Sequence, residues 1–252
     1  MTKRQTVRVI GALLRALTPT RAAIALALAA LVFAAPVFAR CGSTAYSYTG
    51  LQSLTAVRGV RATIVSLATP RVRRGHVAGW VGVSSPNGQE WIQIGVSAFP
   101  GDRMSHIYVE IAQPNRDPIY QTVRSTLPTH QHHRFAVVEL ADRPGWWQAW
   151  LDGSTVSPAV FLAGSHGGWH AQATAESWND NSGACNAYTY SFDDVEVAAA
   201  PDGAWKRMGH ANTFQGAGYR LARRSRSAFI AASVVRPVAR ATATSSPARV
   251  HR

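Results

Sequence analysis

A glutamine and a glutamate stand out because each lies on the polar face of a strand-like segment. Residues 91–96 read WIQIGV, and period-two alternation places the aliphatic residues on one face and Gln93 on the other. Residues 172–178 read QATAESW, and the same alternation separates the small alanines from Glu176. If both segments belong to one sheet, an amide and a carboxylate face the same side. A carboxylate can take a proton from water, and an amide N–H can stabilise an oxyanion.

Aromatic residues gather on the same polar faces of the strand-like segments. Such rings can support either an extended peptide or a sugar chain, since both offer apolar faces. Glu110 and Glu176 also keep a glycan-cleaving role open, because a glycosidase needs two carboxylates across the scissile bond. Polar residues on a solvated sheet face are the plain alternative. The aromatic residues opposite the aliphatic ones are Trp80, Trp91, Tyr108, Trp146, Trp150 and Trp178.

These segments resemble the eqolisins, the glutamic endopeptidases of concanavalin A-like fold, and the chain looks like a divergent, bacterial-type member. The resemblance covers roughly residues 75–198. It implies that Gln93 and Glu176 form the catalytic dyad of a peptide-cleaving hydrolase that needs no cofactor. The matching segments occur in the family's order: 79–83 (GWVGV), 91–96 (WIQIGV), 108–110 (YVE) and 173–178 (ATAESW).

The aromatic and acidic neighbours of the dyad are predicted to bind a polypeptide substrate. After Tyr108 the chain departs from the Tyr/Trp-rich cleft wall of the family, which bears on substrate preference. A non-catalytic lectin-like module that binds glycan on the same face is the alternative function, and a cell-surface adhesion protein is a third. The predicted substrate-binding residues are Trp80, Trp91, Tyr108, Glu110 and Trp178.

The N-terminal segment has the pattern of an export signal. Basic residues precede an uncharged apolar stretch at 22–39, which ends in small residues that suit cleavage after Ala39. We therefore predict a secreted protein. An uncleaved membrane anchor at 22–39 is the alternative, since 18 apolar residues nearly span a bilayer.

Cys41 and Cys185 are the only two cysteines of the chain, and both follow the predicted cleavage site. In an oxidising compartment they are expected to form one disulfide. The alternative is a pair of unpaired thiols.

Charge is distributed very unevenly along the sequence. The formal net charge is +13, yet residues 41–205 hold ten arginines and all 13 acidic residues, a charge of −3. The remaining basic residues lie in the first 40 positions and from Lys206 onward. A nucleic-acid-binding domain would need a basic face on its folded part, so this distribution argues against one.

Short strand-like runs alternate with turn signals from about residue 76 to 197, which predicts an all-β, concanavalin A-like antiparallel β-sandwich. The terminal segments differ in composition, and the last one is predicted to be a disordered basic tail that touches an anionic cell surface at most weakly. We expect a monomer. The predicted division is a signal helix at 1–39, a lead-in and edge strand at 40–75, the sandwich at 76–205 and the tail at 206–252.

Two further clusters have weak metal-binding patterns. His130, His132 and His133 alternate partly as zinc ligands do, but a polar hairpin tip explains them more simply. Residues 178–183 offer oxygen atoms that suit calcium, and an ordinary turn explains the same letters. The loop at 166–170 holds two histidines and is a possible rim of the cleft. We therefore predict no metal site.

Overall fold

A computed structural model gives the arrangement of residues 46–201 and 203–234, and these residues form two antiparallel sheets with no helix. The predicted signal segment, Cys41 and the last residues of the predicted tail lie outside this range. Within it, no helix is long and apolar enough to cross a membrane. The prediction of an all-β protein is confirmed.

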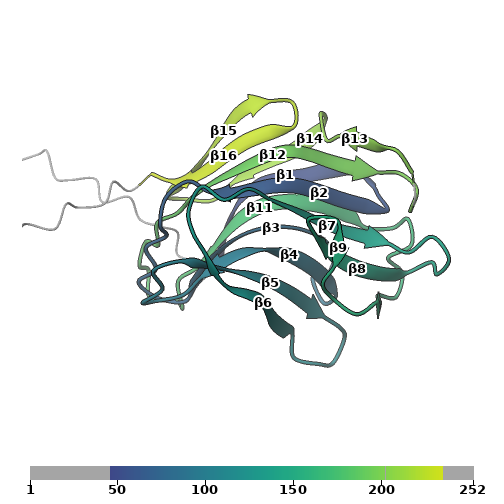
Figure 1. Cartoon of the computed structure of the whole chain (residues 1–252), viewed down its shortest axis with the longest axis horizontal. Helices are drawn as coiled ribbons and strands as arrows, with labels where there is room; N and C mark the ends of the chain where they lie inside the picture. The colour runs from purple at the N-terminus through teal and green to yellow at the C-terminus, as the bar shows by residue number, and fades with distance from the viewer. Residues whose placement is uncertain (1–45, 202, 235–252) are drawn as a thin grey trace, which may run out of the picture. The chain divides into compact units, whose positions relative to one another are not determined.

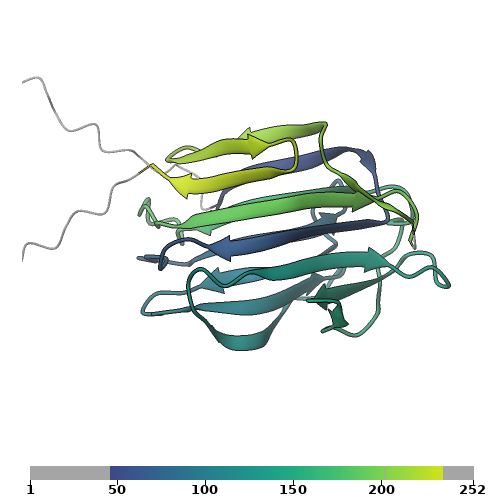
Figure 2. The same cartoon turned by 45° about the horizontal axis from the view of Figure 1, so that its top comes forward.

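The first sheet has seven strands in the order β14-β1-β11-β3-β4-β5-β6. Figure 1 shows it stacked against the second sheet, and the turned view in Figure 2 shows the same layering. Its strands are β1 (Tyr46–Ala56), β3 (His76–Ser84), β4 (Trp91–Ala98), β5 (Ser105–Ala112), β6 (Ile119–Leu127), β11 (His170–Trp178) and β14 (Ala211–Gln215).

The second sheet has nine strands, with β10-β8-β7-β2-β12-β16-β15 as its main path and β9 and β13 paired to β8 and β12. Its strands are β2 (Gly59–Ser66), β7 (His133–Glu139), β8 (Trp146–Leu151), β9 (Ser154–Thr155), β10 (Val160–Phe161), β12 (Thr189–Ala198), β13 (Trp205–Arg207), β15 (Tyr219–Ser225) and β16 (Ala228–Ser233).

The core lies between the two sheets and follows from the alternation of apolar residues. In β4 the side chains of Ile92, Ile94 and Val96 are fully buried and belong to the main hydrophobic cluster. In β11 the small Ala173 and Ala175 face the same core. The intervening residues therefore point to the outer face of the seven-stranded sheet, as the sequence predicts.

The predicted boundaries of the folded region need correction at both ends. Residues 46–66 are not a lead-in with an edge strand: β1 lies inside the seven-stranded sheet, and β2 lies in the middle of the other. Residues 206–234 are not a tail, because they contribute β14, β15 and β16. These late strands are short and bury few side chains, chiefly Tyr219, Phe229 and Ala231, so their composition resembles that of an unfolded segment.

Candidate active site

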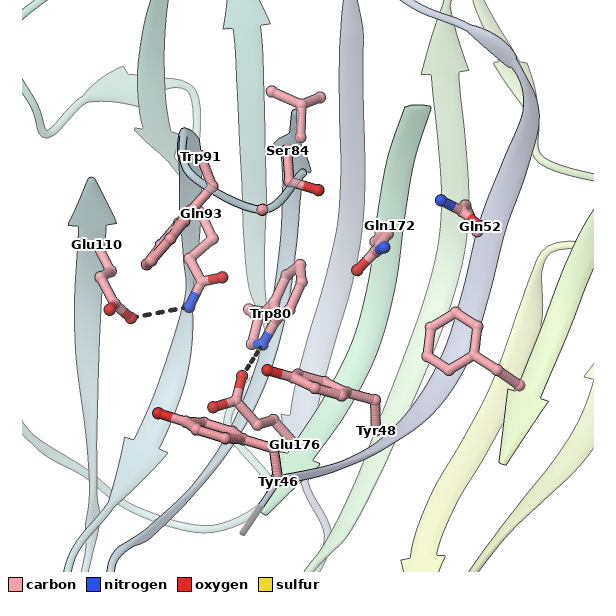
Figure 3. A pocket seen from close by; sticks show the side chains of 13 residues that line it. Tyr46, Tyr48, Gln52, Trp80, Ser84, Trp91, Gln93, Glu110, Gln172 and Glu176 are labelled. Atoms are coloured by element: carbon pink, nitrogen blue, oxygen red, sulfur yellow. Dashed lines mark hydrogen bonds between the residues drawn. The ribbon is translucent and has the colours of Figure 1, made fainter. Parts of the chain in front are cut away.

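The outer face of the seven-stranded sheet carries a pocket of about 500 Å³. Its walls come from β1, β3, β4, β5, β11 and β14, strands that are distant in sequence but adjacent in the sheet. Figure 3 shows the side chains of Gln93, Glu110 and Glu176 pointing into it. The lining residues are Tyr46, Tyr48, Gln52, Trp80, Val83, Ser84, Gly88, Trp91, Gln93, Glu110, Gln172, Glu176 and Phe214.

Strand pairing explains how Gln93 and Glu176 come to share this pocket. β3 lies between β4 and β11, with Gln93 opposite Gly82 and Glu176 opposite Ala78. Trp80 lies between these two small residues on β3, and its indole reaches Glu176. A Cβ atom at Gly82 would lie 2.6 Å from Ile92 O and 2.8 Å from Gln93 Cβ, so a larger residue there would force the backbone that carries Gln93 to shift.

Glu176 is buried, with 6% of its surface exposed, and both of its carboxylate oxygens have partners. Trp80 Nε1 donates to Oε2 at 2.9 Å, and His76 Nε2 lies 2.9 Å from Oε1. An ionised carboxylate has about four acceptor positions, so each oxygen can accept one more hydrogen bond. The carboxylate is therefore held in place and still able to bind a water molecule.

The amide of Gln93 is also buried and fixed. Its Nε2 donates to Tyr108 Oη and to Glu110 Oε2, both at 3.0 Å. The two N–H groups of the amide are thus both in use. Tyr108 is itself buried in a small cluster with Trp80 and Ala78 on this outer face.

Glu110 has an unusual protonation equilibrium. Burial, together with repulsion by Glu176, raises its pKa from 4.5 to about 7, against the lowering effects of His76 and of the Gln93 hydrogen bond. Burial and the same two carboxylates raise the pKa of Tyr46 as well. Among the described residues that line the pocket there is no lysine or arginine, so its electrostatic character is acidic.

The predicted site residues separate into two groups. Gln93, Glu176, Trp80, Trp91 and Glu110 all line the pocket.

Two predicted residues, Tyr108 and Trp178, do not line the pocket but support it. Tyr108 binds Gln93, and Trp178 stacks on Tyr46 with ring centroids 6.1 Å apart. Trp146 and Trp150 alternate with buried residues along β8, as the sequence predicts, but β8 belongs to the other sheet, so these two rings do not line the pocket.

Several pocket residues were not predicted from sequence. Tyr46 and Tyr48 are two positions apart in β1 and therefore lie on one face of the strand. This spacing is visible in the sequence of the predicted lead-in. His76, the partner of Glu176, begins β3 and has no sequence signal of its own. Phe214 lies in β14, within the region predicted to be a tail.

The other predicted clusters have structural partners away from the pocket. His133 Nδ1 lies 2.7 Å from Asp152 Oδ2 in the β7–β8 region, and His166 Nδ1 lies 2.6 Å from the buried Glu139. In the segment considered for calcium, residues 178–183, Ser182 N donates to Asn179 O and closes a turn. Across residues 46–201 and 203–234, no group of three or more His, Cys, Asp or Glu side chains could hold a metal ion.

The fold is similar to that of solved glutamic peptidases. A Scytalido-glutamic peptidase bound to a peptide-based transition-state analogue matches with a TM-score of 0.56 at 15% identity, over 75% of this chain and 98% of that chain. SCP-B, a member of the eqolisin family bound to the tripeptide Ala-Ile-His, matches with a TM-score of 0.54 at 15% identity over the same shares. No protein-family model and no curated protein matches the sequence. At this identity the likeness establishes a shared β-sandwich fold.

Proposed function

We propose that this protein is a secreted hydrolase of the glutamic-peptidase type, with Glu176 as general base and Gln93 as oxyanion donor. The observation that carries the proposal is the pairing of a buried carboxylate and a buried amide from two strands, both pointing into one pocket (Figure 3). The fold shared with glutamic peptidases supports it.

Glu176 supplies the base in this mechanism. A water molecule bound at a free acceptor position of its carboxylate attacks the peptide carbonyl carbon, and the water's proton passes to Glu176. The tetrahedral intermediate then collapses, the C–N bond breaks, and the same proton goes to the leaving nitrogen. The hydrogen bonds from Trp80 and His76 hold the carboxylate in one orientation throughout.

Gln93 must release one of its two present partners in order to donate to the oxyanion. Its hydrogen bond to Glu110 is strongest while Glu110 is ionised, because a charged acceptor binds an N–H group more tightly. Below a pH of about 7 Glu110 is mainly protonated, and the amide is more easily released. We therefore expect activity to decline as the pH rises through about 7.

The test is hydrolysis of an unfolded protein substrate from acidic to neutral pH by the parent protein and two variants. Glu176→Gln is expected to lose about 10²- to 10⁴-fold in kcat, because an amide cannot take the water's proton. Gln93→Glu is expected to lose about 10²- to 10³-fold, because the amide donor is lost and the added carboxylate repels the oxyanion.

Two substitutions of the same kinds outside the pocket serve as controls. Glu90→Gln keeps the acceptor that binds Ala163 N, and Gln148→Glu adds a charge on β8 of the other sheet. Both controls are expected to retain full activity. Equal activity of the parent and Glu176→Gln would contradict the proposed role of the carboxylate.

A glycan-binding module is the second candidate, and the aromatic walls of the pocket favour it. Tyr46, Tyr48, Trp80, Trp91 and Phe214 offer ring faces on which a sugar can pack. If the purified parent cleaves no peptide across the pH range but binds a polysaccharide, this function replaces the peptidase. Binding should then survive Glu176→Gln and weaken in Trp91→Ala.

A further inference from the structure

His76 lies beside the pocket and contacts both Glu176 and a group of aromatic rings. It is the first residue of β3, and its register partner on β11 is Trp178. Its ring lies among three aromatic rings, with centroid distances of 6.3 Å to Tyr46, 5.9 Å to Phe99 and 5.6 Å to Trp178. Its Nε2 lies 2.9 Å from Oε1 of Glu176, and only 23% of the side chain is exposed.

Hydrogen bonds of a buried asparagine fix the backbone next to His76. The fully buried Asn186 donates to the carbonyl oxygens of Arg74 at 2.8 Å and of Trp178 at 3.0 Å. It also accepts a hydrogen bond from Arg73 N at 2.9 Å. The strand enters β3 through Gly75, which has a positive φ of 68° and packs so closely on Trp178 that a Cβ atom would overlap it. The imidazole is therefore held against the carboxylate before any substrate binds.

We propose that His76 is a positioning residue for the Glu176 base: its Nε2–H group donates to Oε1 and fixes the carboxylate opposite Trp80. The hydrogen bond requires a proton on Nε2, which both the imidazolium and one neutral tautomer supply. This inference rests on the proposed peptidase function.

Few other charged or titratable groups face the imidazole. Glu176 contacts it directly, Glu110 lies across the pocket and has its pKa lowered by the charge of His76, and Tyr46 lies at its edge. On the far side of Phe99, His106 is already paired with Asp102 at 2.8 Å. The acidic groups near His76 thus lie on the pocket side, and Glu176 is the one that His76 contacts directly.

Two substitutions separate the hydrogen bond of His76 from its packing. His76→Gln keeps a side-chain N–H donor, whereas His76→Phe keeps only a ring. The value of kcat is expected to fall about tenfold in His76→Phe and to recover in His76→Gln, because one positioning hydrogen bond contributes about that factor. KM is expected to stay within about twofold of the parent in both variants, since His76 acts through Glu176 and does not line the pocket.

The matched control is His106→Gln, which breaks a histidine–carboxylate pair outside the pocket. It is expected to leave kcat and KM unchanged. A merely structural role of His76 would lower the melting temperature of both His76 variants and reduce kcat in His76→Gln as much as in His76→Phe, and that result would overturn the proposal.

A second measurement does not depend on activity. In the NMR spectrum of the parent, the Nε2 proton of His76 is expected to give a downfield signal that exchanges slowly with solvent, because the carboxylate of Glu176 accepts it in a hydrogen bond. Glu176→Ala is expected to lose this signal, and an unchanged signal would overturn the pairing. An inactive parent would reject the peptidase function and with it the positioning role of His76, while the NMR signal would still decide whether the hydrogen bond exists.

Discussion

Two carboxylates face the same pocket, but their hydrogen-bond partners give them different properties. Glu176 receives the indole N–H of Trp80 and is paired with His76, so both of its oxygens are held in place. Glu110 receives one amide N–H, from Gln93, and burial raises its pKa to about 7. In the proposed mechanism, Glu176 is therefore the base, and Glu110 is the group whose protonation frees Gln93.

The raised pKa of Glu110 makes a prediction about stability. Because the folded state binds this proton more tightly than the unfolded state, stability is lost as the pH rises from about 4.5 to about 7, and it stays lost above. Glu110→Gln removes this dependence and keeps an acceptor for Gln93. We compare the free energy of unfolding of the variant with that of the parent. This variant-minus-parent difference is expected to be on the order of 2 kcal/mol larger at alkaline pH than at acid pH.

Urea unfolding of both proteins on either side of that pH interval measures the difference. Glu90→Gln is the control, since it is the same substitution on the β3–β4 turn outside the pocket. A parent-to-variant difference that does not change with pH would show that Glu110 carries no raised pKa in the folded protein.

At the scale of the elements, alternation predicted the strands that carry Gln93 and Glu176. The runs 91–96 and 172–178 appear within β4 and β11, with both side chains on the outer face. Those strands lie in the interior of the sheet, where one face must be apolar, so their pattern is strong. The sheet order was not predictable in the same way, because β11 pairs with β3 and β1 across large separations in sequence.

The elements that sequence analysis missed are mostly edge strands. In β6 nearly every residue is exposed, and β14 and β15 carry mainly polar or basic residues. An edge strand is held by backbone hydrogen bonds on one side and needs few apolar residues, so composition alone resembles that of a loop or tail. His76 was missed for a different reason. Its contact with Glu176 depends on the pairing of β3 with β11, which the sequence does not reveal.

Phe229 of β16 tests whether residues 206–234 belong to the fold. Its ring is fully buried and stacks on Phe192 of β12 with centroids 4.5 Å apart. Phe229→Ala is expected to cost about 3–5 kcal/mol in free energy of unfolding, through lost burial and the cavity that remains. Phe161→Ala is the control, since that ring is 48% exposed, and it is expected to cost less than about 1 kcal/mol. Equal, small effects would mean that the β15–β16 hairpin is not docked.

At the scale of the whole molecule, acidic and basic groups lie on different sheets. The acidic pocket lies on the outer face of the seven-stranded sheet, whereas β15, at one end of the main path of the nine-stranded sheet, carries several arginines. Positive charges along such a strand discourage pairing with another chain. The predicted contact of the basic C-terminal region with an anionic surface remains a proposal, and part of that charge is carried by a folded strand, β15.

The predicted disulfide between Cys41 and Cys185 would join the start of the folded chain to a late loop. Cys41 lies outside the described residues, but it precedes Tyr46 by five positions, and Tyr46 is the register partner of Trp178. Cys185 follows Trp178 by seven positions, is half-buried and packs against the core. Five residues of extended chain reach about 17 Å, so the prediction requires Cys185 to lie within that distance of Tyr46.

Closing so long a loop is worth about 5 kcal/mol in the chain-entropy model, which corresponds to about 10 °C or more in melting temperature. Reduction of the parent, Cys41→Ser, Cys185→Ser and the double variant should therefore all lower the melting temperature by the same amount, because each removes the same covalent link. Mass spectrometry of the unreduced protein should show a single bridge and no thiol. If the double variant melts at the temperature of the oxidised parent, or if two thiols are detected in the unreduced protein, the predicted bridge does not close the chain.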